Sequence, residues 1–224
     1  MIQDNKPGFR KFIAKYSHVW VLLYAFIYMP WFSYLENRTD VNYTLMNSTL
    51  DSYIPFVEFF IILYFLWFLY IGATFVYFFF TDKSGFCRLS AFLITGMTIF
   101  LIVCTVYPNA QALRPTEFTR DNIFVDLVKY LYSIDTSTNV LPSIHVFNSI
   151  GAAIAIMHSD ALKKHRGIQN GAYILTILII LSTVFLKQHS VIDVFAAFVM
   201  AGVMYPMIYS RQMKKAPELS RQHV

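Results

Sequence analysis

The stretch Leu186-Lys187-Gln188-His189-Ser190-Val191-Ile192-Asp193 joins two apolar runs and determines the fold expected for this chain. It places His189 and Asp193 four residues apart, and positions i and i+4 lie on one face of a helix, one turn from each other. The Asp193 carboxylate is therefore expected to reach the His189 ring and to fix its tautomer. Lys187 adds a cation just outside the helix. We expect the other apolar runs to hold this turn at a membrane surface.

The composition is that of an integral membrane protein. Of the 224 residues, 57% are hydrophobic and 14% are charged, and the mean hydropathy is +0.51. A soluble domain has roughly 45–50% apolar and about 25% charged residues. The sequence therefore predicts a single membrane domain over residues 1–224, with a cytoplasmic segment at 1–17 and a cytoplasmic tail at 210–224.

Six apolar runs account for most of the chain, and a helix needs about 20 residues to cross a bilayer. They predict an all-α bundle of six transmembrane helices at about 18–34, 54–80, 89–107, 143–158, 171–186 and 189–209. The fourth and fifth runs are short, so their ends are expected in protein-lined or watery space rather than in lipid. Residues 122–134 form one amphipathic face, which predicts a short helix lying at the interface.

The distribution of Lys and Arg predicts the orientation in the membrane. With a cytoplasmic N-terminus, most of the 18 Lys and Arg residues fall on cytoplasmic segments, and the exceptions are Arg38, Arg114, Arg120, Lys129 and Lys187. Because cytoplasmic loops carry the excess of Lys and Arg, both termini are predicted to be cytoplasmic and the 186–193 turn extracytoplasmic. The membrane would be the plasma membrane or, in a eukaryote, an endomembrane with the turn on its lumenal side. Basic clusters between apolar runs contact anionic lipid, so the net charge of +5 does not indicate nucleic acid binding.

Three polar segments are expected on the same outer side, and ionisable residues at membrane level are usually functional. They are Arg114-Pro115, the stretch Pro142-Ser143-Ile144-His145, and the turn with His189. A histidine oriented by a carboxylate is an activated nucleophile or base, and a second histidine can protonate a departing alkoxide. Arginine matches phosphate oxygens in pairs, and a helix start at Pro142 favours an anion. The pattern predicts attack on phosphorus.

These residues resemble the motifs of the type 2 phosphatidic acid phosphatase (PAP2) superfamily, whose members are six-helix lipid phosphatases and phosphotransferases. The family motifs are Lys-x6-Arg-Pro, Pro-Ser-x-His and Ser-Arg-x5-His-x3-Asp. The second is complete here, whereas Tyr107 replaces the Lys of the first and Thr183 replaces the Arg of the third. The Ser-Thr form of the third motif is also similar to the inositol phosphorylceramide synthase branch.

The resemblance implies a metal-independent lipid phosphatase without a cofactor, with a PAP2-like core at about 54–209. It implies that His189 is the nucleophile that forms a phosphohistidine and that Asp193 orients it. His145 would be the general acid for the leaving group and then the base for the acceptor. The partners implied are a lipid phosphate substrate and the membrane lipids.

The resemblance implies that Arg114 and Ser143 bind the phosphate. Two cations of the family motifs are absent, because Tyr107 and Thr183 stand in their places. Lys187 lies one helical turn beyond the missing Arg and is a candidate to replace one of them, although it could also be a snorkelling interfacial lysine. A phosphodiester carries less negative charge than a monoester, so the missing cations hint at diester or transfer chemistry.

Three other interpretations stay open. One is transfer of a phospho-headgroup to a lipid alcohol, and another is a non-catalytic lipid-binding or transport protein with the same fold. The third is a metal site, since two histidines and a carboxylate are a common ligand set. The Ser and Pro beside His145, with Arg114 and Lys187 nearby, favour an anion over a metal cation.

Overall fold

The computed structural model of this chain describes the backbone of residues 16–220 and the side chains of residues 16–209. Its helical elements are η1 Ser17–Tyr24, α2 Ala25–Glu36, η2 Thr49–Ser52, η3 Glu58–Phe60, α3 Ile61–Thr81, α4 Lys83–Val106, α5 Ile123–Ile134, α6 Ile144–Met157, η4 Leu162–Lys164, α7 Arg166–Phe185 and α8 Val191–Ser220. Two short strands, β1 Thr44–Leu45 and β2 Asn109–Ala110, pair in parallel.

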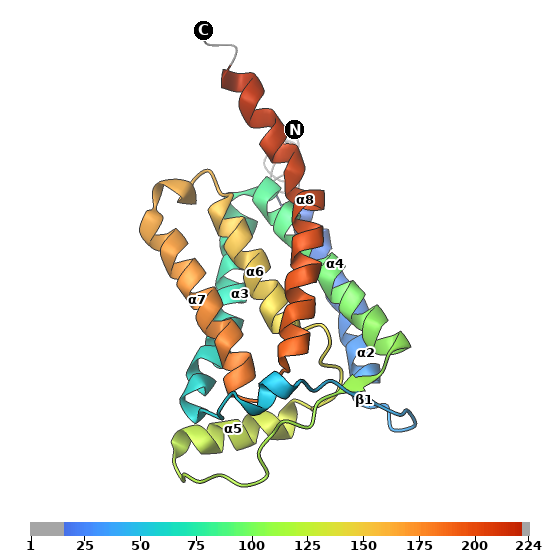
Figure 1. Cartoon of the computed structure of the whole chain (residues 1–224). Helices are drawn as coiled ribbons and strands as arrows, with labels where there is room; N and C mark the ends of the chain where they lie inside the picture. The colour runs from blue at the N-terminus through green and yellow to red at the C-terminus, as the bar shows by residue number, and fades with distance from the viewer. Residues whose placement is uncertain (1–15, 221–224) are drawn as a thin grey trace, which may run out of the picture.

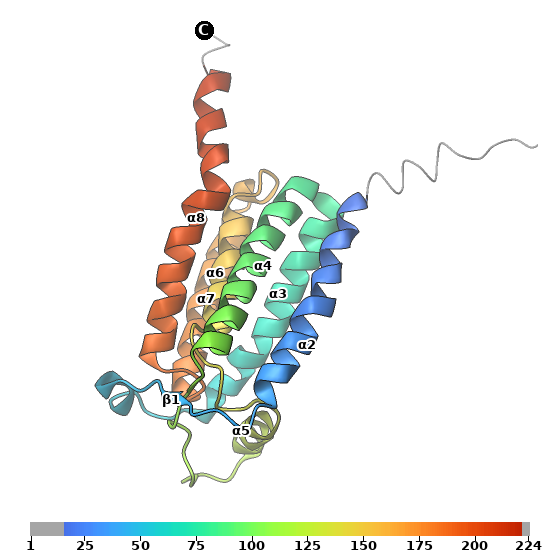
Figure 2. The same ribbon diagram turned by 90° about the vertical axis from the view of Figure 1, so that its right-hand side faces the viewer.

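Helices α2, α3, α4, α6, α7 and α8 run side by side, and α5 lies across one end of the bundle (Figures 1 and 2). We call this the α5 end. Helix α6 packs against α3, α4, α7 and α8, so it is the central helix. Its small residues allow this close packing, because Gly151 faces Phe92 of α4 and Gly96 of α4 faces Phe147. Small residues let the backbones of membrane helices approach.

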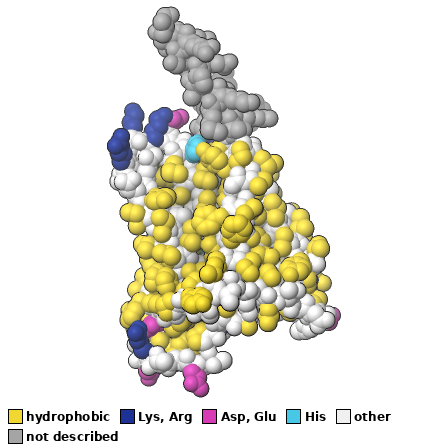
Figure 3. Space-filling model, viewed as in Figure 1, with side chains coloured by type: hydrophobic (Ala, Val, Ile, Leu, Met, Phe, Trp, Pro, Cys, Tyr) yellow, Lys and Arg dark blue, Asp and Glu magenta, His cyan; other side chains and the backbone are white. Residues whose placement is uncertain are grey.

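Five helical segments are long and apolar enough to cross a membrane: Ser17–Glu36, Glu58–Thr81, Lys83–Val106, Arg166–Phe185 and Val191–Tyr209. Hydrophobic side chains cover the flank of the bundle, and charged side chains gather toward its ends (Figure 3). The chain is thus an all-α, multi-pass membrane protein, as the sequence predicts. The sixth predicted span, α6, has 14 residues and is roughly 21 Å long, short of the roughly 30 Å of a hydrocarbon core.

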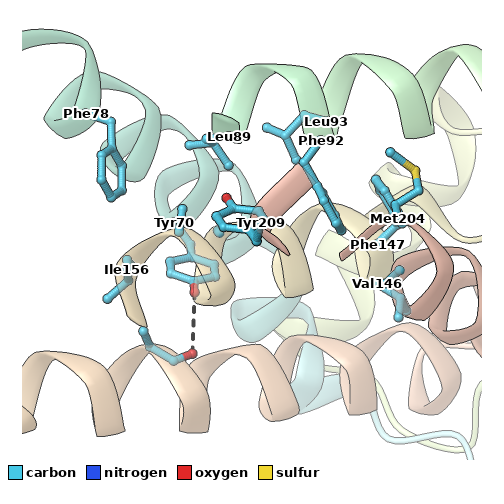
Figure 4. Close-up of a cluster of buried hydrophobic side chains, with 14 of the residues drawn as sticks. Tyr70, Phe78, Leu89, Phe92, Leu93, Val146, Phe147, Ile156, Met204 and Tyr209 are labelled. Atoms are coloured by element: carbon cyan, nitrogen blue, oxygen red, sulfur yellow. Dashed lines mark hydrogen bonds between the residues drawn. The ribbon is translucent and has the colours of Figure 1, made fainter. Parts of the chain in front are cut away.

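The core between α3, α4, α6, α7 and α8 is built from large buried side chains (Figure 4). Phe92 and Phe147 stack with their ring centroids 4.6 Å apart. The Tyr70 hydroxyl lies 3.2 Å from Thr176 Oγ1, so this buried polar group is paired. This packing fixes α6 against its neighbours, and it thereby fixes the residues at the α6 N-terminus.

Several boundaries differ from the sequence prediction. Helix α3 begins at Ile61 rather than at about 54, α7 begins at Arg166 rather than at about 171, and α8 continues to Ser220 rather than ending at about 209. The sequence predicts the third helix from about residue 89, but α4 already begins at Lys83, because the Asp82 side chain accepts a hydrogen bond from Gly85 N at 2.9 Å and caps the helix. The sixth helix was expected from His189, but α8 begins at Val191. A capping-box pattern sets this start, since Ser190 N donates to Asp193 Oδ2 and Ile192 N donates to Ser190 Oγ.

The amphipathic helix predicted at residues 122–134 is confirmed as α5. Asn122 caps it by accepting hydrogen bonds from Phe124 N and Val125 N. Its buried side chains Val128 and Leu131 pack against the start of α3 and against Leu186. Helix α5 therefore closes the bundle directly beside the 186–193 turn.

Candidate functional site

His189 lies in the turn before α8, and Asp193 lies in the first turn of that helix. Their side chains meet as the four-residue spacing predicts, with His189 Nδ1 and Asp193 Oδ2 3.4 Å apart, the long end of hydrogen bonding. Oδ2 also accepts the Ser190 N–H at 2.9 Å, whereas Oδ1 is buried without a partner. The Asp193 carboxylate thus orients both the ring and the helix start.

His145 comes to this pair from the first turn of α6. Its ring centroid lies 5.7 Å from that of His189, and it packs against Tyr64 at 4.7 Å and Trp67 at 4.4 Å. The His145 Nδ1 atom is buried without a hydrogen-bond partner. The structure therefore brings together all three residues predicted to be catalytic.

Ser143 caps α6 and ties it to α8. Its hydroxyl accepts the Val146 N–H at 3.4 Å, and its own N–H donates to the Asp193 carbonyl at 3.2 Å. The first N–H groups of a helix have no partners within the helix and favour an anion. The α6 N-terminus thus lies next to the histidine pair, and the Ser143 hydroxyl holds its local geometry.

Arg114 lies beside the turn, and backbone carbonyls hold its guanidinium. It donates to the backbone carbonyls of Tyr132, Asp135 and Thr136, with the Asp135 bond at 2.8 Å. It also donates to the Gln188 side chain at 2.6 Å. Its guanidinium carbon lies 4.4 Å above the Tyr132 ring. Burial lowers the pKa of Arg114 from its ordinary value. Arg114 therefore contacts Gln188, the residue next to His189 in the sequence.

Lys187 points into a neighbouring loop. Its ammonium donates to Asp51 O at 2.7 Å and to Ile54 O at 2.5 Å, and the residue has a positive φ of 54°. Burial lowers the pKa of Lys187. The charged group of this buried residue is held by backbone carbonyls, and the snorkelling interpretation stays open because it depends on where the membrane surface lies. Its role as a phosphate-binding cation stays a prediction, since the structure gives the ammonium two other partners.

Asp51 is a residue of this site that the sequence analysis missed. Its carboxylate accepts hydrogen bonds from Ser190 Oγ at 2.6 Å and from Val191 N at 2.9 Å, and it also accepts from Ser48 N. The loop at 48–54 therefore clamps the start of α8 from outside the bundle. The Ser48-x-x-Asp51 capping-box pattern predicts the local turn, but nothing local indicates the contact with Ser190.

Asp135 is a second missed residue. Its Oδ2 accepts hydrogen bonds from the Tyr64 hydroxyl at 3.2 Å and from Gln188 Nε2 at 3.1 Å. Burial raises the pKa of the Asp135 carboxyl, and the nearby charges of Arg114 and His189 act in the opposite direction. A carboxyl group thus lies between the turn and α3, close to the histidines.

Thr183 and Tyr107 stand at the two positions where the PAP2 motifs have cations. The Thr183 hydroxyl donates to Ile180 O at 2.8 Å within α7, and the Thr183 carbonyl accepts the N–H groups of Gln188 and His189. Tyr107 is the C-cap residue of α4 and is exposed. Thr183 therefore shapes the turn through its backbone.

The metal-site alternative has no support in the arrangement of side chains. Over residues 16–209, no group of three or more His, Cys, Asp or Glu side chains is placed to hold a metal ion.

A cavity of about 640 Å³ adjoins the histidines. It is lined by η1, α2, α3 and α4, and His145, Asp135 and Tyr64 lie at the α5 end of its lining. Its walls are mostly aromatic and aliphatic, which is usual for sites that bind organic ligands.

Comparison of the chain with family models, with curated proteins and with solved structures finds no match in any of the three. The resemblance to the PAP2 superfamily therefore rests on the motif residues of this chain and stays a prediction.

Proposed function

We propose that this chain is a membrane enzyme that hydrolyses a phosphate ester of a lipid, with His189 as the nucleophile. The observation that carries the proposal is the cluster of His189, Asp193 and His145, with the two rings 5.7 Å apart and the carboxylate on His189 Nδ1. At this separation one phosphate ester can contact both rings. A proton held on Nδ1 by Asp193 leaves Nε2 free to attack.

In the proposed reaction, His189 Nε2 attacks phosphorus, a P–N bond forms, and the P–O bond to the lipid breaks. His145 donates a proton to the departing oxygen. Water then attacks the phosphohistidine and gives its proton to His145 while the P–N bond breaks. Inorganic phosphate leaves, and both histidines return to their starting states. The α6 N-terminus and Arg114 supply the positive potential for the phosphate oxygens.

The α5 end is proposed to face the extracytoplasmic side. The opposite end carries Lys83, Arg88 and the basic loop with Lys163, Lys164 and Arg166, in line with the positive-inside rule. The predicted cytoplasmic cations at residues 6, 10, 11, 15 and 221 lie outside the described residues, and the side chains at 211, 214 and 215 are not described either.

The test is phosphate release by the purified chain in detergent, with phosphatidate and an isoprenyl diphosphate as substrates. We expect release by the wild type, resistance to EDTA, and a loss of at least about 100-fold in His189→Ala and His145→Ala. Equal release by the wild type and both variants refutes hydrolysis at this site and favours a non-catalytic lipid-binding protein. Loss on chelation, restored by added metal, revives the metal interpretation.

Transfer to a lipid alcohol is the second candidate, and the cavity that ends at His145 favours it. His145 is the residue that would activate the acceptor, so a lipid hydroxyl in the cavity would take the place of water. Mass spectrometry of the products, with and without a diacylglycerol or ceramide acceptor, separates hydrolysis from transfer. A phosphorylated acceptor with little free phosphate makes transfer the main reaction.

A further inference from the structure

The segment at 41–57 exposes large apolar side chains at the α5 end of the bundle. Leu45 is 56% exposed, Leu50 is 58% exposed and Tyr53 is 81% exposed. All of this segment is described, and its one charged residue, Asp51, is 3% exposed. Exposed apolar residues gathered in one place mark a surface that contacts a partner or a membrane. The segment therefore differs from an ordinary water-facing loop.

Hydrogen bonds hold this segment at the level where membrane-spanning helices begin and end. Val57 N donates to the carbonyl of Phe185, the last residue of the span Arg166–Phe185, at 3.1 Å. Asp51 accepts at 2.9 Å from the N–H of Val191, the first residue of the span Val191–Tyr209. A third span, Glu58–Thr81, follows the segment directly. The exposed side chains at 50 and 53 therefore lie at the boundary of the hydrocarbon core.

The segment also lies at the rim of the bundle. Figure 2 shows the part around η2 at the left edge, beyond the start of α8, while α5 lies below the bundle. Exposed charged side chains gather instead on α5 and on the segment before it, at Glu117, Arg120, Asp121, Asp126 and Lys129. The α5 end thus has a charged part that suits water and an uncharged apolar part at the rim, where a bilayer surrounds the bundle.

We propose that residues 45–53 form an interfacial anchor, which inserts Leu50 and Tyr53 into the headgroup region of the leaflet at the α5 end. The partner is the bilayer surface, since this apolar rim is continuous with the surface of the spanning helices. Tyrosine is enriched at this depth, because its ring is apolar and its hydroxyl is polar. The segment exposes no cation, so the attraction is apolar and does not require anionic lipid.

The anchor has a consequence for the 186–193 turn. Asp51 lies between Leu50 and Tyr53 in the sequence, and it points inward to Ser190 Oγ and Val191 N. The residues that contact lipid and the residue that holds the start of α8 therefore belong to one short segment. The bilayer surface thereby sets the depth of the turn that carries His189, whether or not the chain hydrolyses a lipid.

The test uses the full chain in nanodiscs of zwitterionic lipid, with Cys87 and Cys104 replaced by Ala. A bimane label is attached at Thr49→Cys, which is exposed and leaves both anchor residues in place. Lipids with a nitroxide near the top of the acyl chain quench a label that they contact. We expect quenching at least about threefold stronger than for a label at Asp126→Cys on α5, because interfacial side chains lie about 5–10 Å into the headgroup boundary.

Matched variants separate the anchor from its polar neighbours. Leu50→Ser combined with Tyr53→Ser should lower quenching of the label at 49 to the level found at 126. Asn42→Ser combined with Asn47→Ser changes the same segment without removing an apolar side chain, and it should leave quenching unchanged. A label at Leu69→Cys, which is 67% exposed within a span, should be quenched by a nitroxide near the end of the acyl chain in every variant. That quenching shows that the variant is inserted and folded.

Three results would overturn the proposal. Equal lipid quenching at 49 and 126, with aqueous iodide reaching both labels, would mean that the segment faces water. Weak quenching at 49 by both lipid and iodide would mean that protein, such as a second copy of the chain, covers it. Quenching that requires anionic lipid, or that is lost at high salt, would mean that charge rather than apolar insertion holds the segment. Phosphate release is measured separately, so the anchor and the proposed function can fail independently.

Discussion

At the scale of single residues, Asp193 holds two groups with one oxygen. Its Oδ2 faces both His189 Nδ1 and the Ser190 N–H, and its Oδ1 has no partner. The carboxylate therefore couples the orientation of the proposed nucleophile to the start of α8. An amide in its place can keep its oxygen at this position and accept from Ser190 N, but it brings no negative charge to the ring.

We therefore predict that Asp193→Asn lowers kcat for phosphate release by roughly 10³- to 10⁴-fold, the size of the effect of the same change in a Ser-His-Asp triad, because the charge that stabilises the ring is lost. The thermal unfolding temperature should change little, because the cap to Ser190 N is kept. The measurements are phosphate release and circular dichroism melting in detergent. A kcat within about threefold of the wild type would mean that Asp193 has only a structural role.

The Asp135 carboxyl gives a second prediction at this scale, because burial raises its pKa. The unfolded chain then releases the proton at a lower pH than the folded chain does. The free energy of unfolding should fall as pH rises above the unfolded value of about 3.9, until pH passes the folded-state pKa.

Replacement by Asn removes this titration, so Asp135→Asn should flatten the pH dependence and raise the unfolding temperature at pH 7 relative to the wild type. Both expectations are checked by the thermal unfolding temperatures of the variant and the wild type, measured between about pH 4 and pH 8. The amide oxygen can still accept from Tyr64. A steeper pH dependence of stability in the variant would contradict a raised pKa of Asp135 in the folded chain.

At the scale of elements, the loop at 48–54 and the turn at 186–193 form one clamp. Asp51 accepts from Ser190 Oγ and Val191 N, while Lys187 returns two hydrogen bonds to carbonyls of the same loop. Both residues have low exposure. The proposed nucleophile sits between these two anchor points.

We predict that Asp51→Ala lowers the free energy of unfolding by about 2–3 kcal/mol, because hydrogen bonds to a charged group are lost. Lys187→Met should cost a similar amount through its carbonyl partners. If Lys187 instead replaced the missing phosphate-binding cation, its loss would reduce activity far more than stability. Paired measurements of melting and of phosphate release decide between the two roles, with Lys129→Met on exposed α5 as the control.

At the scale of the whole molecule, the close contact of α4 with α6 fixes the depth of His145 in the bundle. A Cβ at Gly96 would overlap the Phe147 ring, and a Cβ at Gly151 would lie 2.7 Å from Phe92. Either change forces the two helices apart or displaces a stacked aromatic ring.

We predict that Gly96→Leu destabilises the protein by about 1–3 kcal/mol or more, as overpacking does. The matched control is Gly167→Leu, since a Cβ there meets nothing within 4 Å. Unfolding in detergent compares the two. Equal stability of Gly96→Leu and the wild type would mean that α4 and α6 do not approach as closely as in the structure.

Orientation is also a property of the whole molecule. Asn42 is exposed at the α5 end, and Lys164 is exposed in the basic loop at the other end. In a chain with Cys87 and Cys104 replaced by Ala, we predict that a membrane-impermeant maleimide labels Asn42→Cys in intact cells. Lys164→Cys should react only after permeabilisation. The reverse pattern would place the α5 end in the cytoplasm.

The sequence by itself determined the all-α membrane bundle, because run length and hydropathy are local properties that bilayer thickness turns into helices. It also indicated the contact of His189 with Asp193 from their four-residue spacing, although His189 lies in the turn before α8, and it indicated α5 from its amphipathic pattern. Only the tertiary structure decided the partners of Arg114 and Lys187 and revealed Asp51 and Asp135. These contacts join distant segments, such as Lys187 with Asp51 136 positions away. A carbonyl can hold a lysine as well as a phosphate can, and the sequence does not show which of them lies within reach.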